Sequence, residues 1–201
     1  MEDKNFSVPD SLQLITQMIN TAKKEQKDSG RGWILWGWLL FSGSILTFIN
    51  FYTNWTSTWV IWNFFAVAAV LLLLYSIIRT IFFPKAVKVK TYTGDLFIKL
   101  NIGFFIFLLL IIVAINNNSI SPSKGFSMLL GLYGFWILIY GTALNFKPSV
   151  YGAYITWACA FAALYVDHFK WVMLLQAVAV LSGYIIPGHL AYREFNKQKN
   201  I

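Results

Sequence analysis

The residues of this chain that could do chemistry are a few polar side chains placed within long apolar segments. A polar group surrounded by hydrocarbon is costly without a partner, so these positions are where a function should be sought. If they face one another, they form a polar cavity that binds a coupling ion or a solute. The candidate polar cavity comprises Lys99, Asn101, Tyr133, Tyr140, Gln176 and Ser182.

A structural role is the simpler interpretation of the same residues. Asp95 and Lys99 are four residues apart, which on a helix allows an ion pair between them. Lysine so near the end of an apolar segment can also extend its ammonium group to water. Asn101 and Gln176 can form hydrogen bonds between helices, which typically contribute about 0.6–2 kcal/mol each and fix packing. Both interpretations stay open from the sequence.

The most distinctive local string runs from Gly183 to Leu190 and contains Pro187, Gly188 and His189. Proline has no backbone N–H, so Pro187 predicts a kink in the last helix about one turn from its end. The kink would place His189 near a membrane surface, where an imidazole can sense pH or bind a ligand. A hydrogen-bonded interfacial histidine is the simpler alternative.

Motifs of known catalytic sites are missing from the sequence. It contains no HExxH, GxSxG or Walker pattern, and Cys159 is its one cysteine, so no CxxC pair or Cys/His cluster exists for zinc or redox work. The apolar segments hold almost no acidic residues, which argues against a carboxylate pair. We therefore expect no metal or cofactor. The sequence leaves enzymatic activity open, with the balance against an enzyme because no catalytic motif is found. An enzyme acting on lipid near His189 and Arg193 stays as a third possibility.

Composition indicates what surrounds these residues. Of the 201 residues, 58% are apolar and 12% are charged, whereas a soluble domain carries roughly 25% charged residues. A water-facing surface needs charges, and a lipid-facing surface does not. Trp and Tyr are abundant and suit the boundary between membrane and water. The chain is therefore predicted to be an integral membrane protein.

Six apolar segments are long enough to cross a hydrocarbon layer of about 30 Å, which takes about 20 helical residues. They are continuously apolar, unlike the alternating strands of a barrel. The predicted fold is all-α, a polytopic bundle of six transmembrane helices that pair as three hairpins, with internal duplication left open. The segments are Trp33 to Phe51, Trp59 to Phe83, Leu96 to Ile115, Phe126 to Phe146, Val150 to Val166, and Trp171 to Tyr192.

Basic residues fix the predicted orientation. With six spans, fourteen Lys and Arg residues fall on one side and two, Lys124 and Lys170, on the other. Cytoplasmic loops carry such an excess, so both termini are predicted to be cytoplasmic, in the inner (plasma) membrane. Orientation and attraction to anionic lipid explain the net charge of +8 without direct nucleic-acid binding.

The chain divides into residues 1–31, a cytoplasmic amphipathic helix and linker, residues 32–192, the transmembrane domain, and residues 193–201, a basic cytoplasmic tail. Ser7, Pro9 and Asp10 form a helix-start signal. The helix that follows has one apolar side, which would lie on headgroups, pack under the bundle or bind a partner protein. The candidate partner-binding residues are Leu12, Ile15, Met18 and Ile19.

The sequence resembles a family of uncharacterised bacterial integral membrane proteins with six spans. The similar strings are the predicted helix from Ser11 to Ile19, Trp33 to Gly37 at the start of the first span, and Gly183 to Leu190. Such proteins are often encoded beside a winged-helix regulator. The resemblance implies an accessory or regulatory role and no particular activity.

Three functional hypotheses follow. The favoured one is an accessory or regulatory subunit that binds a partner through its N-terminal helix and the basic loop holding Lys85, Lys88 and Lys90. The alternative is a small-solute transporter or channel component, either alone or as a homo-oligomer. The third is the interfacial enzyme acting on lipid.

Overall fold

The computed structural model describes residues 30–82 and 92–199, and every regular element in these ranges is helical. The predicted all-α class is thereby confirmed. The predicted N-terminal helix with Leu12, Ile15, Met18 and Ile19 lies outside the described residues, as do Lys85, Lys88 and Lys90. The elements are α2 (Arg31–Thr53), α3 (Thr58–Phe82), α4 (Tyr92–Asn116), α5 (Pro122–Ala143), α6 (Lys147–Leu164), α7 (Phe169–Val180), a π-helical turn η1 (Leu181–Ile185) and α8 (Ile186–Lys199).

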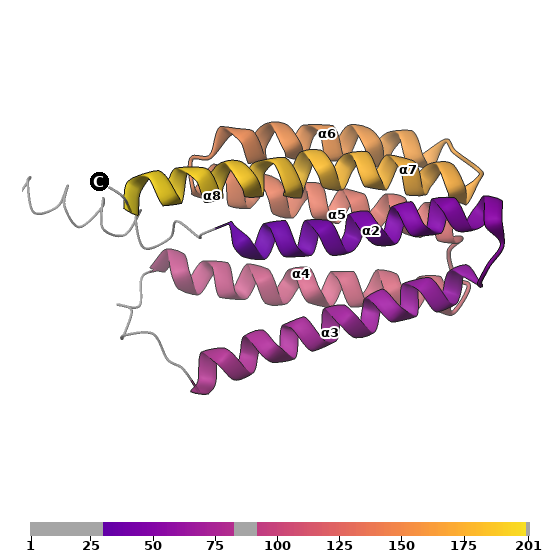
Figure 1. Cartoon of the computed structure of the whole chain (residues 1–201), viewed down its shortest axis with the longest axis horizontal. Helices are drawn as coiled ribbons and strands as arrows, with labels where there is room; N and C mark the ends of the chain where they lie inside the picture. Colours follow the sequence, from indigo (N-terminus) through magenta and orange to yellow (C-terminus); the bar gives the residue numbers. More distant parts are fainter. Residues whose placement is uncertain (1–29, 83–91, 200–201) are drawn as a thin grey trace, which may run out of the picture.

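The helices lie side by side along one long axis and alternate in direction (Figure 1). α7, η1 and α8 follow one another without a break, so that one rod runs from Phe169 to Lys199. The connections 54–57, 117–121 and 165–168 gather at one end of the bundle, which we call the loop end. At the other end, which we call the basic end, lie Arg31, Lys147, Arg193 and Lys197.

Four helical segments of the described chain are long and apolar enough to cross a membrane. They are α2, residues Leu96–Asn116 within α4, α5, and residues Phe169–Lys197. Large apolar side chains also cover their outer sides, for example Ile106 at 61% exposure and Phe135 at 52%. Exposing so large an apolar surface to water costs free energy, whereas exposing it to lipid does not. The fold is therefore compatible with a membrane protein.

α5, α6 and the α7–η1 segment form the densest part of the bundle. Leu130, Ile137, Val172 and Met173 are at most 1% exposed there. Small residues bring the backbones close, a usual feature of helix packing in lipid. A Cβ at Gly141, for example, would lie 2.8 Å from the Ser149 Cβ of α6. The 18-residue α6 is the shortest uninterrupted rod. It buries small residues on one side along its length and exposes large ones, such as Phe161 at 67%, on the other.

α2 packs along the α7–η1–α8 rod. Phe48 meets Trp171 and Phe51 meets Phe169, both with ring centroids 6.1 Å apart. Further along, a Cβ at Gly37 would lie 2.9 Å from the Ile185 Cγ1. The first and last helices of the described chain are therefore neighbours.

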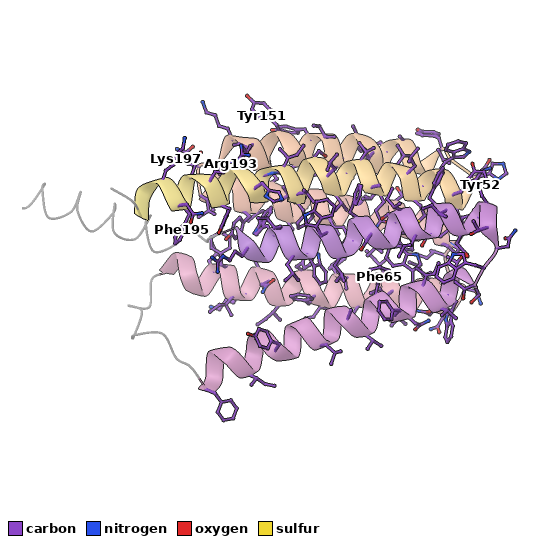
Figure 2. The ribbon with its side chains drawn as sticks, viewed as in Figure 1. Tyr52, Phe65, Tyr151, Arg193, Phe195 and Lys197 are labelled. Atoms are coloured by element: carbon purple, nitrogen blue, oxygen red, sulfur yellow. The ribbon has the colours of Figure 1, made fainter. Side chains whose placement is uncertain are left out.

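α3 lies at the periphery. Its inward contacts are near the loop end, where the Phe65 ring lies 3.2 Å from the position of a Cβ at Gly43, and Trp62 meets Phe126 with centroids 4.8 Å apart. Figure 1 shows α3 diverging from α4 toward the basic end, and Figure 2 labels Phe65 on it. Several described apolar side chains of α3 are exposed, such as Phe64 at 69% and Leu71 at 60%.

Candidate functional site

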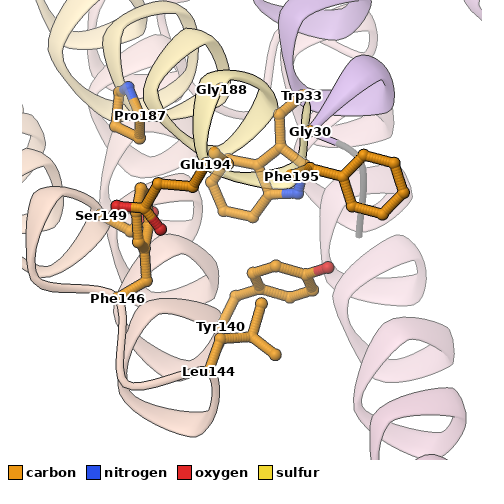
Figure 3. A pocket seen from close by; sticks show the side chains of 11 residues that line it. Gly30, Trp33, Tyr140, Leu144, Phe146, Ser149, Pro187, Gly188, Glu194 and Phe195 are labelled. Carbon is orange, nitrogen blue, oxygen red and sulfur yellow. The ribbon is translucent and has the colours of Figure 1, made fainter. Parts of the chain in front are cut away.

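A pocket of about 50 Å³ opens at the basic end of the bundle, where α2 and α6 begin and α5 ends beside α8 (Figure 3). We call it the basic-end pocket. That volume suits a few waters or one small group, since drug-sized ligands occupy about 300–1,000 Å³. Its lining residues are Gly30, Trp33, Tyr140, Leu144, Phe146, Ser149, Pro187, Gly188, Ala191, Glu194 and Phe195.

Two glycines position the start of α2 against α8. Gly30 has a φ of 69°, a left-handed conformation that glycine adopts readily. A Cβ at Gly30 would lie 2.6 Å from the Gly188 carbonyl oxygen, and a Cβ at Gly188 would lie 2.9 Å from the Ile34 Cγ1. Both positions exclude side chains, so the two backbones approach closely and form one wall of the pocket.

The last rod carries an irregularity just before Pro187. Residues Leu181–Ile185 form a π-helical turn, and the helix then continues as α8 through Pro187 to Lys199. Proline cannot donate the hydrogen bond that a regular α-helix needs, and π-turns often accompany such interruptions and functional sites. The sequence predicts a kink at Pro187, and the structure places the departure from α-helix one turn earlier. Pro187 is fully buried in the pocket wall.

Aromatic rings from four elements gather beside the pocket. The Trp33 ring of α2 meets Tyr140 of α5 with centroids 4.7 Å apart, and Tyr184 of η1 at 5.3 Å. Phe97 of α4 meets Tyr140 at 5.7 Å. Trp33 and Tyr140 thus form a fixed aromatic surface, and Phe195 of α8 stands beside them (Figure 3).

Two polar side chains also line the pocket. Glu194 of α8 is an exposed residue of the lining, and its carboxylate lies toward Ser149 and Phe146 in Figure 3. Ser149 is only 2% exposed. Among the described residues, neither side chain has a hydrogen bond or ion pair with another. The pocket therefore combines aromatic faces with an anionic group.

A second, more open hollow lies on the other side of α8. His189, Tyr192, Arg193, Asn196 and Lys197 line it, and the Arg31 guanidinium lies 5.4 Å from the Tyr192 ring centroid. Figure 2 shows Arg193 and Lys197 at this end of the bundle and Tyr52 at the other. The predicted interface group is thus divided, because Pro187 and Gly188 line the basic-end pocket whereas His189 lies in the second hollow.

The six residues of the predicted polar cavity do not share one location. Lys99 and Asn101 are exposed on α4, while Tyr133 and Gln176 are buried. Ser182 donates to carbonyl oxygens of its own rod, those of Val178 at 3.0 Å and Ala179 at 3.1 Å. Tyr140 lines the basic-end pocket.

Some polar groups inside the bundle tie helices together. The Ser127 hydroxyl of α5 donates to the Ala160 carbonyl of α6 at 2.6 Å, and the Trp157 Nε1 donates to the Gly131 carbonyl at 3.0 Å. The buried Thr47 Oγ1 and Gln176 Oε1 have no hydrogen-bond partner among the described residues. Packing therefore explains some of these polar groups, and those of Thr47 and Gln176 stay unexplained by it.

Sequence reasoning missed Trp33, Glu194 and Phe195 as site residues. Glu194 carried a usable signal, since it is an acidic residue within a basic tail. Trp33 and Phe195 carried none, because aromatic residues are abundant throughout the chain. The predicted tail beginning at residue 193 is helical up to Lys199 and supplies part of the site. No group of three metal-binding side chains occurs in the part of the chain that the structure describes.

No model of a known protein family matches the sequence, and no curated protein or solved structure matches it either.

Proposed function

We propose that this chain is a multi-pass inner-membrane protein with six spans, which acts as an accessory or regulatory subunit through recognition at its basic end. One observation carries this proposal. The interior between α2, α5, α6 and α7 is filled with apolar and small side chains, whereas the basic-end pocket opens where α8 leaves the bundle. A recognition role needs an accessible surface site and not a passage through the bundle.

The proposed six spans are the four segments described above as long and apolar enough to cross a membrane, together with α3 and α6. α3 has 25 residues and no charge before Arg79. α6 has 18 residues, which at about 1.5 Å each give roughly 27 Å, slightly less than a hydrocarbon layer. A bilayer can thin locally around a slightly short helix at a modest cost in free energy. Six alternating spans also return both ends of the chain to one side.

The charge distribution supports cytoplasmic termini. In the described chain, Arg31, Lys147, Arg193 and Lys197 lie at the basic end, and the loop end carries Lys124 and Lys170. The remaining basic residues of the chain, apart from Lys99, lie outside the described residues or near the same end, and the sequence predicts all of them on the side of Arg31. Lysine and arginine in short connections remain on the cytoplasmic side during insertion. The basic end is therefore proposed to face the cytoplasm.

The accessory role is tested with paired substitutions in the N-terminal segment. Leu12 and Ile15 are changed to Ser in one variant, and Gln13 and Gln17 in the control, because the control residues lie off the predicted apolar side. After cross-linking in membranes, the first variant should lose the partners recovered with the wild type, and the control should keep them. Deletion of residues 1–24 should act like the first variant while the spans stay inserted. The same cross-linked partners in all variants would contradict the accessory role.

A transporter is the second candidate, because Thr47 and Gln176 leave polar atoms unpaired inside the bundle. Contacts along α2 and α7 place these residues at a similar height, since Phe48 meets Trp171 and Phe51 meets Phe169. Stopped-flow swelling of proteoliposomes in small polar solutes distinguishes the two functions. If the protein has the accessory role, its proteoliposomes should swell at the same rate as liposomes without protein. Faster swelling that is abolished by Gln176→Leu would favour transport.

A further inference from the structure

We infer that the basic-end pocket binds an alkylammonium group, and that this group is the headgroup amine of a zwitterionic phospholipid. The inference rests on the proposed membrane placement and gives the proposed recognition site a ligand class. The pocket lies at the end of the spans, the level at which headgroups are found. Its lining offers aromatic faces on one side and a carboxylate on the other.

The aromatic surface supplies the first part of the recognition. A cation is attracted to the face of Trp or Tyr within about 6 Å of the ring centroid, and the attraction is larger where water is excluded. Trp33 and Tyr140 are half-buried and hold each other at 4.7 Å, so their orientation is set before a ligand arrives. Tyr184 also meets Trp33, with ring centroids 5.3 Å apart, and is 5% exposed. An ammonium group would therefore meet a preformed surface.

Glu194 supplies the second part. Lys147, Arg193 and Lys197 lie at the same end of the bundle, yet none of the described basic residues forms an ion pair with Glu194. An unpaired carboxylate at the rim of an apolar pocket favours a cation, because charge-assisted hydrogen bonds are stronger than neutral ones. A primary ammonium has three donors and matches a carboxylate beside the Ser149 hydroxyl.

The basic surroundings decide between a simple cation and a zwitterion. An isolated cation would be repelled by the Lys and Arg residues at this end, whereas a phosphate joined to the amine through a two-carbon chain would be attracted to them. Lys147 begins α6, and no side chain caps the first N–H groups of that helix. Pro148 has no N–H and the Ser149 N–H donates to the Phe146 carbonyl at 3.2 Å, so α6 offers an anion the Lys147 N–H and the positive end of the helix dipole. A phosphoethanolamine headgroup carries both charges at short separation.

Lipid exchange on the intact protein tests the inference. The purified full chain is mixed with phosphatidylethanolamine or phosphatidylglycerol of identical acyl chains, and the bound lipid is counted by native mass spectrometry. We expect phosphatidylethanolamine to be retained preferentially. Glu194→Gln should weaken its retention about tenfold, which corresponds to about 1.4 kcal/mol, and should leave phosphatidylglycerol retention unchanged. Asp167→Asn, which removes an exposed carboxylate at the loop end, is the control and should match the wild type.

Equal retention of both lipids by the wild type would overturn the inference, as would equal behaviour of Glu194→Gln and Asp167→Asn. Ethanolamine added alone distinguishes a free amine from a lipid. Millimolar ethanolamine could raise the Tm of the wild type but not that of Glu194→Gln, while lipid retention shows no preference. That result would support the alkylammonium site and overturn the assignment of a phospholipid as its ligand. A chain that is stable without detergent would refute the membrane placement itself, so the two failures are distinguishable.

Discussion

Gly152 of α6 and Gly183 of η1 lie in direct backbone contact, with 2.9 Å between the Gly183 Cα and the position of a Cβ on Gly152. A Cβ on Gly183 would lie 2.9 Å from the Thr156 Oγ1. That hydroxyl donates to the Gly152 carbonyl at 2.8 Å and lies 3.3 Å from the Ala179 carbonyl. The π-turn therefore packs closely against α6 because both contact positions are glycines, and the Thr156 hydroxyl bridges the two elements. This contact lies one turn before the wall of the basic-end pocket.

Alanine at position 152 should destabilise the bundle. Its Cβ would meet backbone atoms of Ser182 and Gly183, which cannot move without separating α6 from η1, so we expect a loss of about 1–3 kcal/mol. Gly131→Ala is the matched control, because a Cβ there meets nothing within 4 Å. The control should equal or exceed the wild type, since alanine favours helix over glycine. Thermal unfolding in detergent measures both, and equal Tm values for the two variants would refute the close contact.

Two Thr→Val substitutions should change the stability of the fold in different ways. Thr47 and Thr156 are both at most 1% exposed, but the Thr47 Oγ1 has no partner among the described residues whereas the Thr156 Oγ1 bonds to α6 and reaches α7. Thr47→Val should leave stability unchanged or raised, because a buried unpaired hydroxyl is removed. Thr156→Val should lose about 0.5–1.5 kcal/mol. Equilibrium unfolding in mixed micelles gives both values. Strong destabilisation by Thr47→Val would instead indicate a bound water or ligand at that hydroxyl.

Asn50 should stabilise the connection between α2 and α3. Its amide Nδ2 donates to the Thr56 carbonyl at 2.7 Å, and its Oδ1 accepts from the Thr56 N–H at 3.1 Å. Asn50→Ala breaks both bonds at a buried residue and should cost about 1–3 kcal/mol. Asn63→Ala serves for comparison, because Asn63 is exposed and bonds to the Trp59 carbonyl of its own helix. Comparable losses of Tm in both variants would argue against a special role for Asn50.

The proposed topology can be read from cysteine labelling. Cys159 is the one cysteine of the chain and is 7% exposed, so Cys159→Ala gives a background without accessible thiols. In that background, Asn117→Cys at the loop end should react with a membrane-impermeant maleimide on intact cells. Lys197→Cys at the basic end should react after permeabilisation. Simultaneous labelling of both positions on intact cells would contradict cytoplasmic termini.

Much of the helical framework was predictable from local composition. Each apolar segment became a helix, and most bounds lie within four residues of the prediction. The last rod, however, continues past the predicted end at Tyr192 to Lys199. Lipid-length segments without charge have few alternatives to helix, because backbone groups in hydrocarbon must bond to one another. The π-turn was not predictable, since it depends on Gly183 meeting Gly152 across the bundle.

The predicted cavity shows why polar residues alone did not locate the site. Asn101 and Gln176 are equally polar and equally deep in their segments, but one faces outward and the other is buried. Segments that are apolar on all sides give almost no periodic signal for the inward side. Glu194 lay outside every predicted span and was therefore assigned to a solvated tail.

The sequence by itself determined the helical class and the long apolar segments, because each follows from the composition of single segments. Only the tertiary structure decided that α2 packs along α7, η1 and α8, and that Trp33, Tyr140 and Glu194 surround one pocket. Those contacts join residues more than one hundred positions apart. They depend on where glycines allow two helix backbones to approach closely, and the sequence of a single segment does not show which other segment it will meet.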